Sequence, residues 1–329
     1  MVQFILRRFL AMLLTLFAVS FVAFAIIQLP PGDFLTSYMA SLAAQGDQVD
    51  PRVIENLRQQ YGLGEPYLVQ YWKWFTGILQ GNFGQSFEWK RPVWELIWGR
   101  IGYSLLIEGM AVIAMWLIAL PIGVYAAVRK YSLGDYLATI GGFIGLAIPN
   151  FLFALILMYL SFVWFGRTIG GLFSPGFENA HWSLPRIWDF LQHAWIPVLV
   201  LATAGTAELI RILRANLLDE LKKPYVTTAR SKGLPEWKVI LKYPVRMALN
   251  PLVSTIGWLL PALVSGSVIV SVVMNLPTAG PMLLRSLTTQ DMYLAGAIIL
   301  LLSVLTVIGT LISDILLAWI DPRIRYGSR

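Results

Sequence analysis

The sequence contains no cysteine and only two histidines, His181 and His193. Without cysteine the chain cannot form a disulfide framework, a thiolate metal site or a dithiol redox pair. Two imidazoles are also too few for a histidine-built centre. We therefore expect no metal site and no proton-transfer site that depends on histidine.

Charge is scarce as well. Only 13% of the 329 residues are charged, against about 25% in an ordinary soluble protein, while 57% are hydrophobic and the mean hydropathy is +0.67. A soluble chain of this length would form about two domains, and so few charges could not cover the surfaces of two. The composition therefore excludes an ordinary soluble protein and favours a membrane protein.

Long apolar runs recur along the chain. About 20 apolar residues cross the hydrocarbon core as a helix, which predicts an all-α integral membrane protein with six transmembrane helices. The first run is longer than the apolar region of a signal peptide and lacks an A-x-A cleavage site, so we expect an uncleaved helix. The fourth is the weakest because Glu208 and Arg211 lie near its end; they are spaced for an i,i+3 ion pair. The predicted spans cover residues 9–29, 103–128, 137–165, 194–213, 251–274 and 293–320.

The remaining segments define the expected domain organisation. An N-terminal transmembrane helix (1–30) precedes a small insert (31–100), in which we expect a short helix at 51–61 capped by Asp50 and an amphipathic helix at 68–79. The core (101–322) contains five spans and a basic loop at 214–250, and a tail (323–329) closes the chain.

The basic residues predict the orientation. Of the 25 Lys and Arg residues, 16 lie on one predicted side, namely at the chain start, after spans two and four, and in the tail. By the positive-inside rule both termini and the loop 214–250 are then cytoplasmic, and the insert is periplasmic. The net charge of +7 thus marks topology, and no nucleic acid is needed to explain it.

Signatures of catalysis are absent. The sequence has no G-x-x-x-x-G-K-[ST] phosphate loop, no H-E-x-x-H and no G-x-S-x-G. Neither histidine lies in a predicted span, where an intramembrane nucleophile would need a base. We expect no catalytic residues, and no P-loop binding of ATP by this chain.

The loop 214–250 is the most informative segment. Pro224 can begin a short helix, Gly233 can end it, and Pro235 can begin a second. The residues predict two short helices across a glycine, a compact knob at the membrane surface. The spacing alone leaves two interpretations open: a connector held to anionic headgroups by its lysines, or a docking element for another protein.

Residues 225–234, Tyr-Val-Thr-Thr-Ala-Arg-Ser-Lys-Gly-Leu, resemble the cytoplasmic coupling loop of ABC importer permeases, called the EAA loop, and most closely that of the oligopeptide/dipeptide branch. The similarity extends over nearly the whole chain, because other motifs of the branch follow in order. They are Tyr61-Gly62-Leu63, Gly81-Asn82-Phe83-Gly84-Gln85-Ser86, Ile148-Pro149-Asn150-Phe151, Asn275-Leu276-Pro277 and Asp321-Pro322-Arg323-Ile324-Arg325-Tyr326.

The resemblance implies a type I ABC importer permease in the bacterial inner membrane, with a coupling loop that fits a cleft on an ATPase. Its implied partners are a second, similar permease subunit, two ABC ATPase subunits or domains that bind ATP and Mg²⁺, a periplasmic substrate-binding protein and the lipid bilayer, with no cofactor in this chain. The implied cargo is peptides or a similar small solute; oligosaccharides and metal chelates are alternatives.

The resemblance also supplies the expected ATPase-coupling residues. The Glu-Ala-Ala…Gly positions of the general motif are occupied by Thr227, Thr228, Ala229 and Gly233; the two threonines depart from it, as do Tyr243, Val245 and Arg246 at its Ile-x-Leu-Pro end. The peptide branch drifts at these positions too. The expected coupling residues are Tyr225, Thr227, Thr228, Ala229, Arg230, Lys232, Gly233 and Leu234.

Ionisable groups inside spans are functional candidates. Glu108 and Asp314 are the candidate intramembrane carboxylates; we favour a structural role for Glu108, and Asp314 could pair with a basic group of the loop or tail. The alternative is an ion-coupled secondary transporter that uses them, although we see no clear inverted repeat. A scaffold protein fits the missing catalytic residues but not the coupling-loop resemblance.

Glycines and prolines in two spans are candidates for the walls or hinges of a pathway. Small residues allow close helix packing, and proline allows a bend. Ordinary packing explains them equally well from sequence alone. The candidates are Gly145, Pro149, Pro261 and Gly266.

Overall fold

The structure is a computed structural model. In the part that it describes, the chain is helical apart from turns, loops and one isolated antiparallel bridge between Gln85 and Pro92. Its contacts divide the chain into two compact units, which are treated separately: 1–102 with 278–307, and 103–277 with 308–329. The described residues are 2–28, 52, 64–166, 170–178, 180–254, 262–264 and 266–320.

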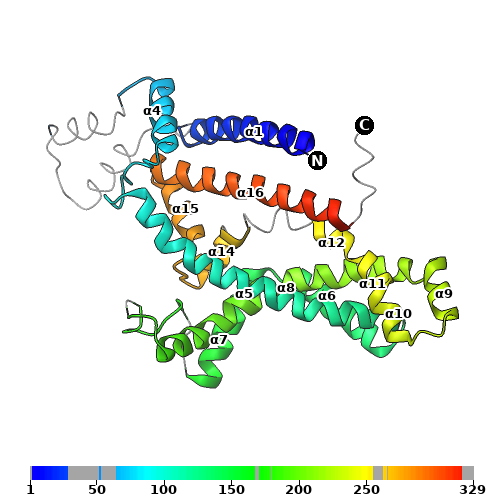
Figure 1. Ribbon diagram of the computed structural model, residues 1–329. Coiled ribbons are helices and arrows are strands. Elements are labelled where there is room, and N and C mark those ends of the chain that lie inside the picture. The colour runs from blue at the N-terminus through cyan, green and yellow to red at the C-terminus, as the bar shows by residue number, and fades with distance from the viewer. Residues whose placement is uncertain are drawn as a thin grey trace. The chain divides into compact units, whose positions relative to one another are not determined.

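The first unit contains α1 (Val2–Gln28), α4 (Tyr67–Leu79) and α15 (Ala279–Thr288), with the start of α5 (Val93–Val128) and most of α16 (Met292–Ile320) (Figure 1). Its core is aromatic. Phe24 of α1 packs with Tyr71 and Trp74 of α4, and the Tyr71 hydroxyl lies 2.9 Å from Ser20 Oγ. The amphipathic helix predicted at 68–79 is confirmed as α4.

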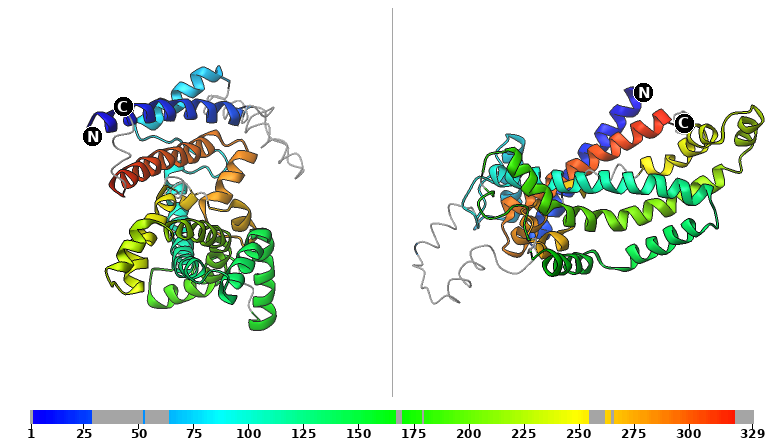
Figure 2. Two further views of the ribbon diagram at one scale, coloured as in Figure 1. Left: turned by 90° about the vertical axis from the view of Figure 1, so that its right-hand side faces the viewer. Right: turned by 90° about the horizontal axis from the view of Figure 1, so that it is seen from below.

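The second unit is built around α8 (Leu184–Glu220), on which α6 (Leu133–Ala147) and α7 (Asn150–Phe165) both pack (Figure 2). Buried Leu213 and Leu217 form a cluster with Ile240 and Val245 from the segment after α8. That segment consists of four short helices: α9 (Pro224–Ser231), α10 (Glu236–Lys242), α11 (Pro244–Ala248) and α12 (Asn250–Ser254); α14 (Val268–Val273) follows later.

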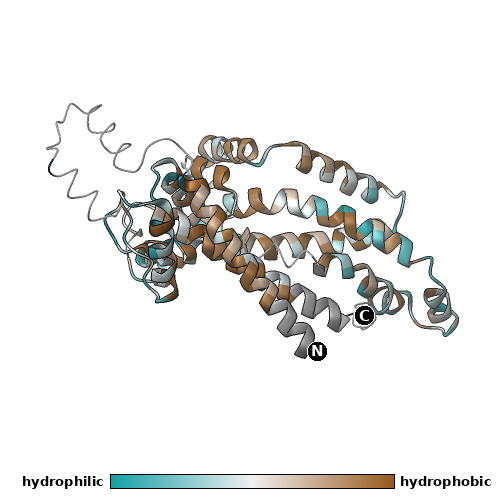
Figure 3. Ribbon diagram, turned by 90° about the horizontal axis from the view of Figure 1, so that it is seen from above, coloured by the Kyte–Doolittle hydropathy of each residue, from teal (hydrophilic) through white to brown (hydrophobic). Residues whose placement is uncertain are grey.

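Four described helices are long and apolar enough to cross a membrane, and a bent helix pair provides a fifth candidate. Figure 3 shows hydrophobic residues along the long helices and hydrophilic residues towards the far end of α8 and the loops beyond it. The four single helices coincide with predicted spans one, two, four and six. They are Leu10–Gln28, Val93–Val128, Leu184–Glu220 and Met292–Ile312.

The third predicted span is not one straight helix. α6 ends at Ala147, α7 begins at Asn150, and their axes differ by 100°. Pro149 causes the break, because a proline excludes the helical conformation at the residue before it. Ile148 is accordingly extended, with φ −82° and ψ 121°.

The fifth predicted span is also interrupted in its described part. The chain is helical at 262–264 and again in α14, but Gly266 between them has φ +54°. The prediction of one uninterrupted helix at 251–274 is therefore wrong at this point. Apolar composition alone could not reveal the interruption.

Two helices are longer than the predicted spans. α8 begins at Leu184 and ends at Glu220, so it takes in residues assigned to the loops on both sides of the predicted span 194–213. α5 begins at Val93, inside the predicted insert. Helices that continue beyond the apolar core carry charged residues there, which is why hydropathy placed their ends too early.

Some predictions fall outside the described residues. They concern the helix at 51–61, of which only Arg52 is described, the Tyr61-Gly62-Leu63 motif, Pro261, and the tail including the motif 321–326. Asp314 lies within α16, but its side chain is also outside the described part.

Candidate functional site

The predicted knob is present as α9 and α10, joined by a turn at Gly233. Gly233 has φ +72°, a left-handed conformation that costs an L residue about 1–2 kcal/mol. A Cβ at this position would meet no atom within 4 Å. Glycine is therefore required here by the backbone conformation and not by lack of space.

An ion pair closes the knob across this turn. Arg230 Nη2 donates to Glu236 Oε1 at 2.6 Å, and Arg230 Nε lies 3.2 Å from both carboxylate oxygens. The guanidinium lowers the pKa of Glu236. Since Arg230 lies in the last turn of α9 and Glu236 begins α10, the pair links the two helices.

The interior of the knob is small and apolar. Val226 and Ala229 of α9 pack against Val239 of α10, with Leu234 and Tyr243 partly buried beside them. Ala229 and Leu234 therefore belong to the knob's interior. The other predicted coupling residues are exposed: Tyr225, Thr227, Thr228, Arg230, Lys232 and Gly233.

Tyr225 connects the knob to α8. Its hydroxyl donates to Glu220, the last residue of α8. Partial burial and this carboxylate raise the pKa of Tyr225. The start of α9 is thereby held to the end of the long helix.

A buried ion pair lies near the same end of α8. Arg214 donates through Nε and Nη2 to the two oxygens of Asp135 at 2.6 and 2.8 Å, and the Asp135 side chain is only 2% exposed. Asp135 also accepts from the Tyr131 N–H at 2.9 Å. The pair joins the turn between α5 and α6 to the helix that leads into the knob.

Glu108 contacts the interruption in the fifth predicted span. Its carboxylate accepts a hydrogen bond from the Ser267 backbone N–H, and a Cβ on Gly266 would lie 2.3 Å from Glu108 Oε1. A backbone N–H left unpaired inside an apolar layer is costly. Glu108 thus serves as its acceptor, which agrees with the structural role favoured from the sequence.

Gly145 marks a close approach between α6 and α8. A Cβ there would lie 3.1 Å from Thr203 Cγ2 and 3.7 Å from Ala207 Cβ. Gly145 therefore has a packing role in this structure, and Pro149 produces the bend between α6 and α7. A part of either residue in a pathway remains a prediction.

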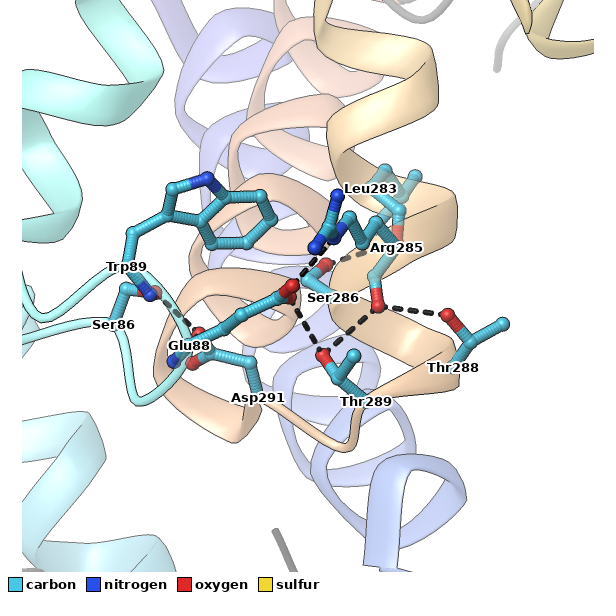
Figure 4. Close-up of polar contacts among 9 residues, drawn as sticks. All are labelled: Ser86, Glu88, Trp89, Leu283, Arg285, Ser286, Thr288, Thr289 and Asp291. Carbon is cyan, nitrogen blue, oxygen red and sulfur yellow. Dashed lines mark hydrogen bonds and ion pairs between the residues drawn. The ribbon is translucent and has the colours of Figure 1, made fainter. Parts of the chain in front are cut away.

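The first unit carries a polar junction near α15, drawn in Figure 4. Ser86 Oγ donates to Asp291 Oδ2 at 2.5 Å (Figure 4). Asp291 also accepts from the N–H groups of Glu88 and Leu294, each at 3.3 Å. Asp291 is fully buried. Burial raises the pKa of Asp291, while these donors oppose the increase.

Glu88 extends from the same loop to the end of α15. Its carboxylate accepts from Arg285 and from Thr289 Oγ1, the latter at 3.1 Å (Figure 4). The Arg285 guanidinium also lies 5.5 Å from the centre of the Trp89 ring. The loop that follows the Gly81–Ser86 motif is therefore held to the connection between α15 and α16.

A buried cation, Arg186, organises the loop before α8. Its guanidinium lies 4.6 and 4.7 Å from the centres of the Phe173 and Trp182 rings. It also donates to the backbone carbonyls of Ala180 and Glu178. No sequence pattern predicted this contact.

The pairing of Asp135 with Arg214 and the burial of Asp291 were not predicted from the sequence either. A signal for Asp135 was present, because Ser132-Leu133-Gly134-Asp135 has the Ser-x-x-acidic spacing of a capping box before an apolar run. Partners far apart in sequence leave no comparable signal. Among the described residues no three metal-ligating side chains gather.

The family model described as "Binding-protein-dependent transport system inner membrane component" matches residues 119–326. The chain belongs to this family. A second model, for the N-terminal part of the membrane component of such systems, matches residues 1–108. The resemblance drawn from the coupling loop and the other motifs is thereby confirmed.

Full-length relatives agree. The chain is 38% identical over 327 residues to the oligopeptide transport system permease protein AppB of Bacillus subtilis, covering 99% of this chain and 100% of that one. It is 34% identical to the glutathione transport system permease protein GsiC of Salmonella typhimurium, with coverage of 99% and 100%. A putative peptide permease protein of Brucella ovis is 32% identical, with coverage of 99% of both chains.

Among solved structures, a chain of the MetNI methionine ABC transporter in an inward-facing conformation has the same fold. The TM-score is 0.52 at 18% identity, covering 69% of this chain and 97% of that one. The chain is therefore a permease subunit of a binding-protein-dependent ABC importer, located in the inner membrane.

Proposed function

We propose that this permease forms half of the translocation pathway for peptides or a similar small solute, which a periplasmic binding protein delivers. ATP hydrolysis by partner subunits drives the transport. The observation that carries the proposal is the knob of α9 and α10, a rigid exposed element fastened to a long apolar helix.

The knob has the properties of a docking element. Thr227, Thr228 and Lys232 are exposed, while the Arg230–Glu236 pair and the apolar interior keep the shape fixed. A rigid element loses little conformational entropy on binding. We propose that the exposed surface of α9 fits an ATPase subunit, and that α8 transmits its displacement to the membrane part.

The assembly follows from this division of work. The sequence has no phosphate loop, so ATP and Mg²⁺ are bound by two ABC ATPase subunits or domains. Half a pathway requires a second, similar permease subunit. The insert and the Glu88–Arg285 junction would seat the binding protein on the opposite side of the membrane.

The orientation rests on charge. The described turn after α5 carries Arg129 and Lys130, and the segment after α8 carries further Lys and Arg residues. Basic loops are retained on the cytoplasmic side. We propose six spans, with both termini and the knob cytoplasmic and the insert periplasmic.

The cargo proposal is drawn from the relatives, whose names specify oligopeptides, peptides and glutathione. Oligosaccharides and metal chelates remain the alternative cargo. Identifying the ligand that co-purifies with the partner binding protein tests this part, and a sugar or a chelate there would contradict it.

Cross-linking tests the docking of the knob. Because the chain lacks cysteine, Thr228→Cys introduces the only thiol, and Thr76→Cys on α4 is a matched control at another exposed threonine. In the assembled transporter we expect a thiol-reactive cross-linker to join position 228, but not 76, to an ATPase subunit. Equal cross-linking from both positions, or none from 228, would contradict the docking proposal.

A further inference from the structure

A second surface of the knob segment faces away from α8. Trp237 and Leu241 on α10 are 62% and 55% exposed, and Lys238, Lys242 and Arg246 are exposed beside them. Lys238 and Lys242 are four residues apart and share one face of α10, while Arg246 lies on α11, after the break at Tyr243. We call these five residues the basic–aromatic face.

The opposite side of the same segment is buried, and this burial turns the basic–aromatic face outward. Ile240 and Val245 are buried in the cluster with Leu213 and Leu217 of α8, and Val239 is buried in the interior of the knob. The segment is thus amphipathic: one side is fixed by packing, while the basic–aromatic face combines a tryptophan, a leucine and three cations.

These cations have no acidic partners. Within the part of the chain that the structure describes, none of Lys238, Lys242 and Arg246 forms an ion pair, although nearby Arg230 does. Lys238 Nζ lies 5.4 Å from the centre of the Trp237 ring, which keeps the cation beside the apolar surface. The face therefore suits a ligand that is both anionic and apolar.

The depth of the face supports the same ligand. The Asp135–Arg214 pair, with Arg129 and Lys130 at the end of α5, marks the end of the apolar layer. Leu217 lies three residues beyond Arg214, which is about 4.5 Å along a helix. The part of α10 and α11 that packs on Leu217 therefore lies beyond the apolar part of α8, where basic residues gather.

We propose that the basic–aromatic face binds the headgroups of anionic phospholipids at the membrane surface. Trp237 and Leu241 enter the boundary of the acyl chains, and Lys238, Lys242 and Arg246 contact headgroup phosphates. The segment from α9 to α11 then has two surfaces with different partners. The exposed surface of α9 binds the ATPase, and the basic–aromatic face of α10 and α11 binds lipid.

A fluorescent label on a single cysteine tests the position of the face. Leu241→Cys lies on the basic–aromatic face, and Thr227→Cys on α9 is the control. The labelled permease is placed in nanodiscs of phosphatidylcholine and phosphatidylglycerol that contain a lipid with a nitroxide on its headgroup. We expect strong quenching at 241 and little at 227. Equal quenching, or loss of the quenching at 241 when ATPase subunits are added, would overturn the proposal.

Charge removal tests the anionic preference. Lys238→Gln with Lys242→Gln removes two charges from the face. Lys222→Gln with Lys223→Gln removes two from the exposed turn after α8, outside the basic–aromatic face, and is the matched control. The measured quantity is the quenching at 241 by nitroxide-labelled phosphatidylglycerol relative to labelled phosphatidylcholine.

Lys238→Gln with Lys242→Gln should reduce the preference for phosphatidylglycerol about fivefold for each lysine, since one lysine near the membrane surface contributes ~1 kcal/mol. The control variant should leave this preference unchanged. No change in the first pair, or an equal loss in both, would overturn the proposal. All four lysines are exposed, so both variants should fold. The readout involves neither ATP nor cargo, so it can fail without affecting the proposed transport function.

Discussion

At the scale of single residues, Glu108 shows how a carboxylate is accommodated in an apolar helix. It accepts the Ser267 N–H that the interruption at Gly266 leaves without a helical partner. This contact requires an acceptor oxygen but no movement of a proton. It therefore gives Glu108 a reason to be present in an ATP-driven importer and weakens the case for an ion-coupled carrier.

Substitution of Glu108 separates these two roles. Glu108→Gln keeps an acceptor oxygen, so stability and uptake should stay close to those of the parent. Glu108→Leu leaves the N–H unpaired and should lower the free energy of unfolding by about 1–3 kcal/mol. Thermal unfolding and ATP-driven uptake of the two variants check this. Complete loss of uptake in Glu108→Gln with normal stability would instead indicate proton coupling.

The Asp135–Arg214 pair is a second contact whose importance depends on burial. Removing one partner leaves the other charge poorly solvated, which typically costs about 3–5 kcal/mol; the lower end applies here because the Arg214 side chain is 27% exposed. Arg211, one turn earlier and exposed, provides the comparison.

We expect Asp135→Asn and Arg214→Gln each to lower the unfolding midpoint clearly, and Arg211→Gln to change it little. In a double-mutant cycle the combined variant should lose much less than the sum of the single losses. Additive losses would show that the two side chains do not act as a pair.

At the scale of elements, the knob depends on one backbone conformation and one ion pair. Gly233 has a left-handed φ in open space, so the conformation of the turn, and not steric contact, restricts the residue. Asparagine tolerates this conformation, whereas a β-branched residue does not.

Gly233→Val should therefore uncouple or release the ATPase subunits while the chain remains in the membrane, and Gly233→Asn should retain most ATP-driven uptake. Co-purification of the ATPase and uptake measurements check both variants. Normal uptake in Gly233→Val would contradict the coupling role of the knob.

The Arg230–Glu236 ion pair should make the packing of α9 against α10 depend on pH. Arg230 lowers the pKa of Glu236 below its usual 4.5, so the pair's contribution is complete above about pH 4.5 and is lost as the pH falls through the lowered pKa. Spin labels on α9 and α10 should report a fixed distance at neutral pH that broadens under acid. In Glu236→Gln the distance distribution should be broad at both pH values. A narrow distribution in this variant at neutral pH would show that the ion pair does not hold the two helices together.

Much of the local structure of these elements was predictable from sequence. Proline at the start and glycine at the end of short segments act locally, and they correctly predicted the two-helix knob around Gly233. The bend at Pro149 was also predicted as possible. Gly266 was also among the candidate hinges, but its contact with Glu108, 158 positions earlier in the chain, was not predicted.

The same limit applies to the polar junction near α15. Asp291 is buried only because Ser86 and the Glu88 backbone reach it from about 200 residues away. Ala229 illustrates the converse: the family motif singled it out as a coupling residue, and the structure shows that it packs inside the knob with Val226 and Val239. Its part in coupling remains a prediction.

At the scale of the whole molecule, the chain is one component of a larger machine. Family membership establishes an inner-membrane permease of a binding-protein-dependent importer, and the sequence supplies no means of hydrolysing ATP. We propose that the exposed surface of the knob receives mechanical work from a separate ATPase.

Uptake by the reconstituted transporter tests this account most directly. The permease is inserted into vesicles with its partner subunits and loaded binding protein, and uptake is measured with ATP, without ATP, and with a proton gradient alone. The account predicts uptake with ATP only, abolished by Gly233→Val. Uptake driven by the gradient without ATP would contradict it.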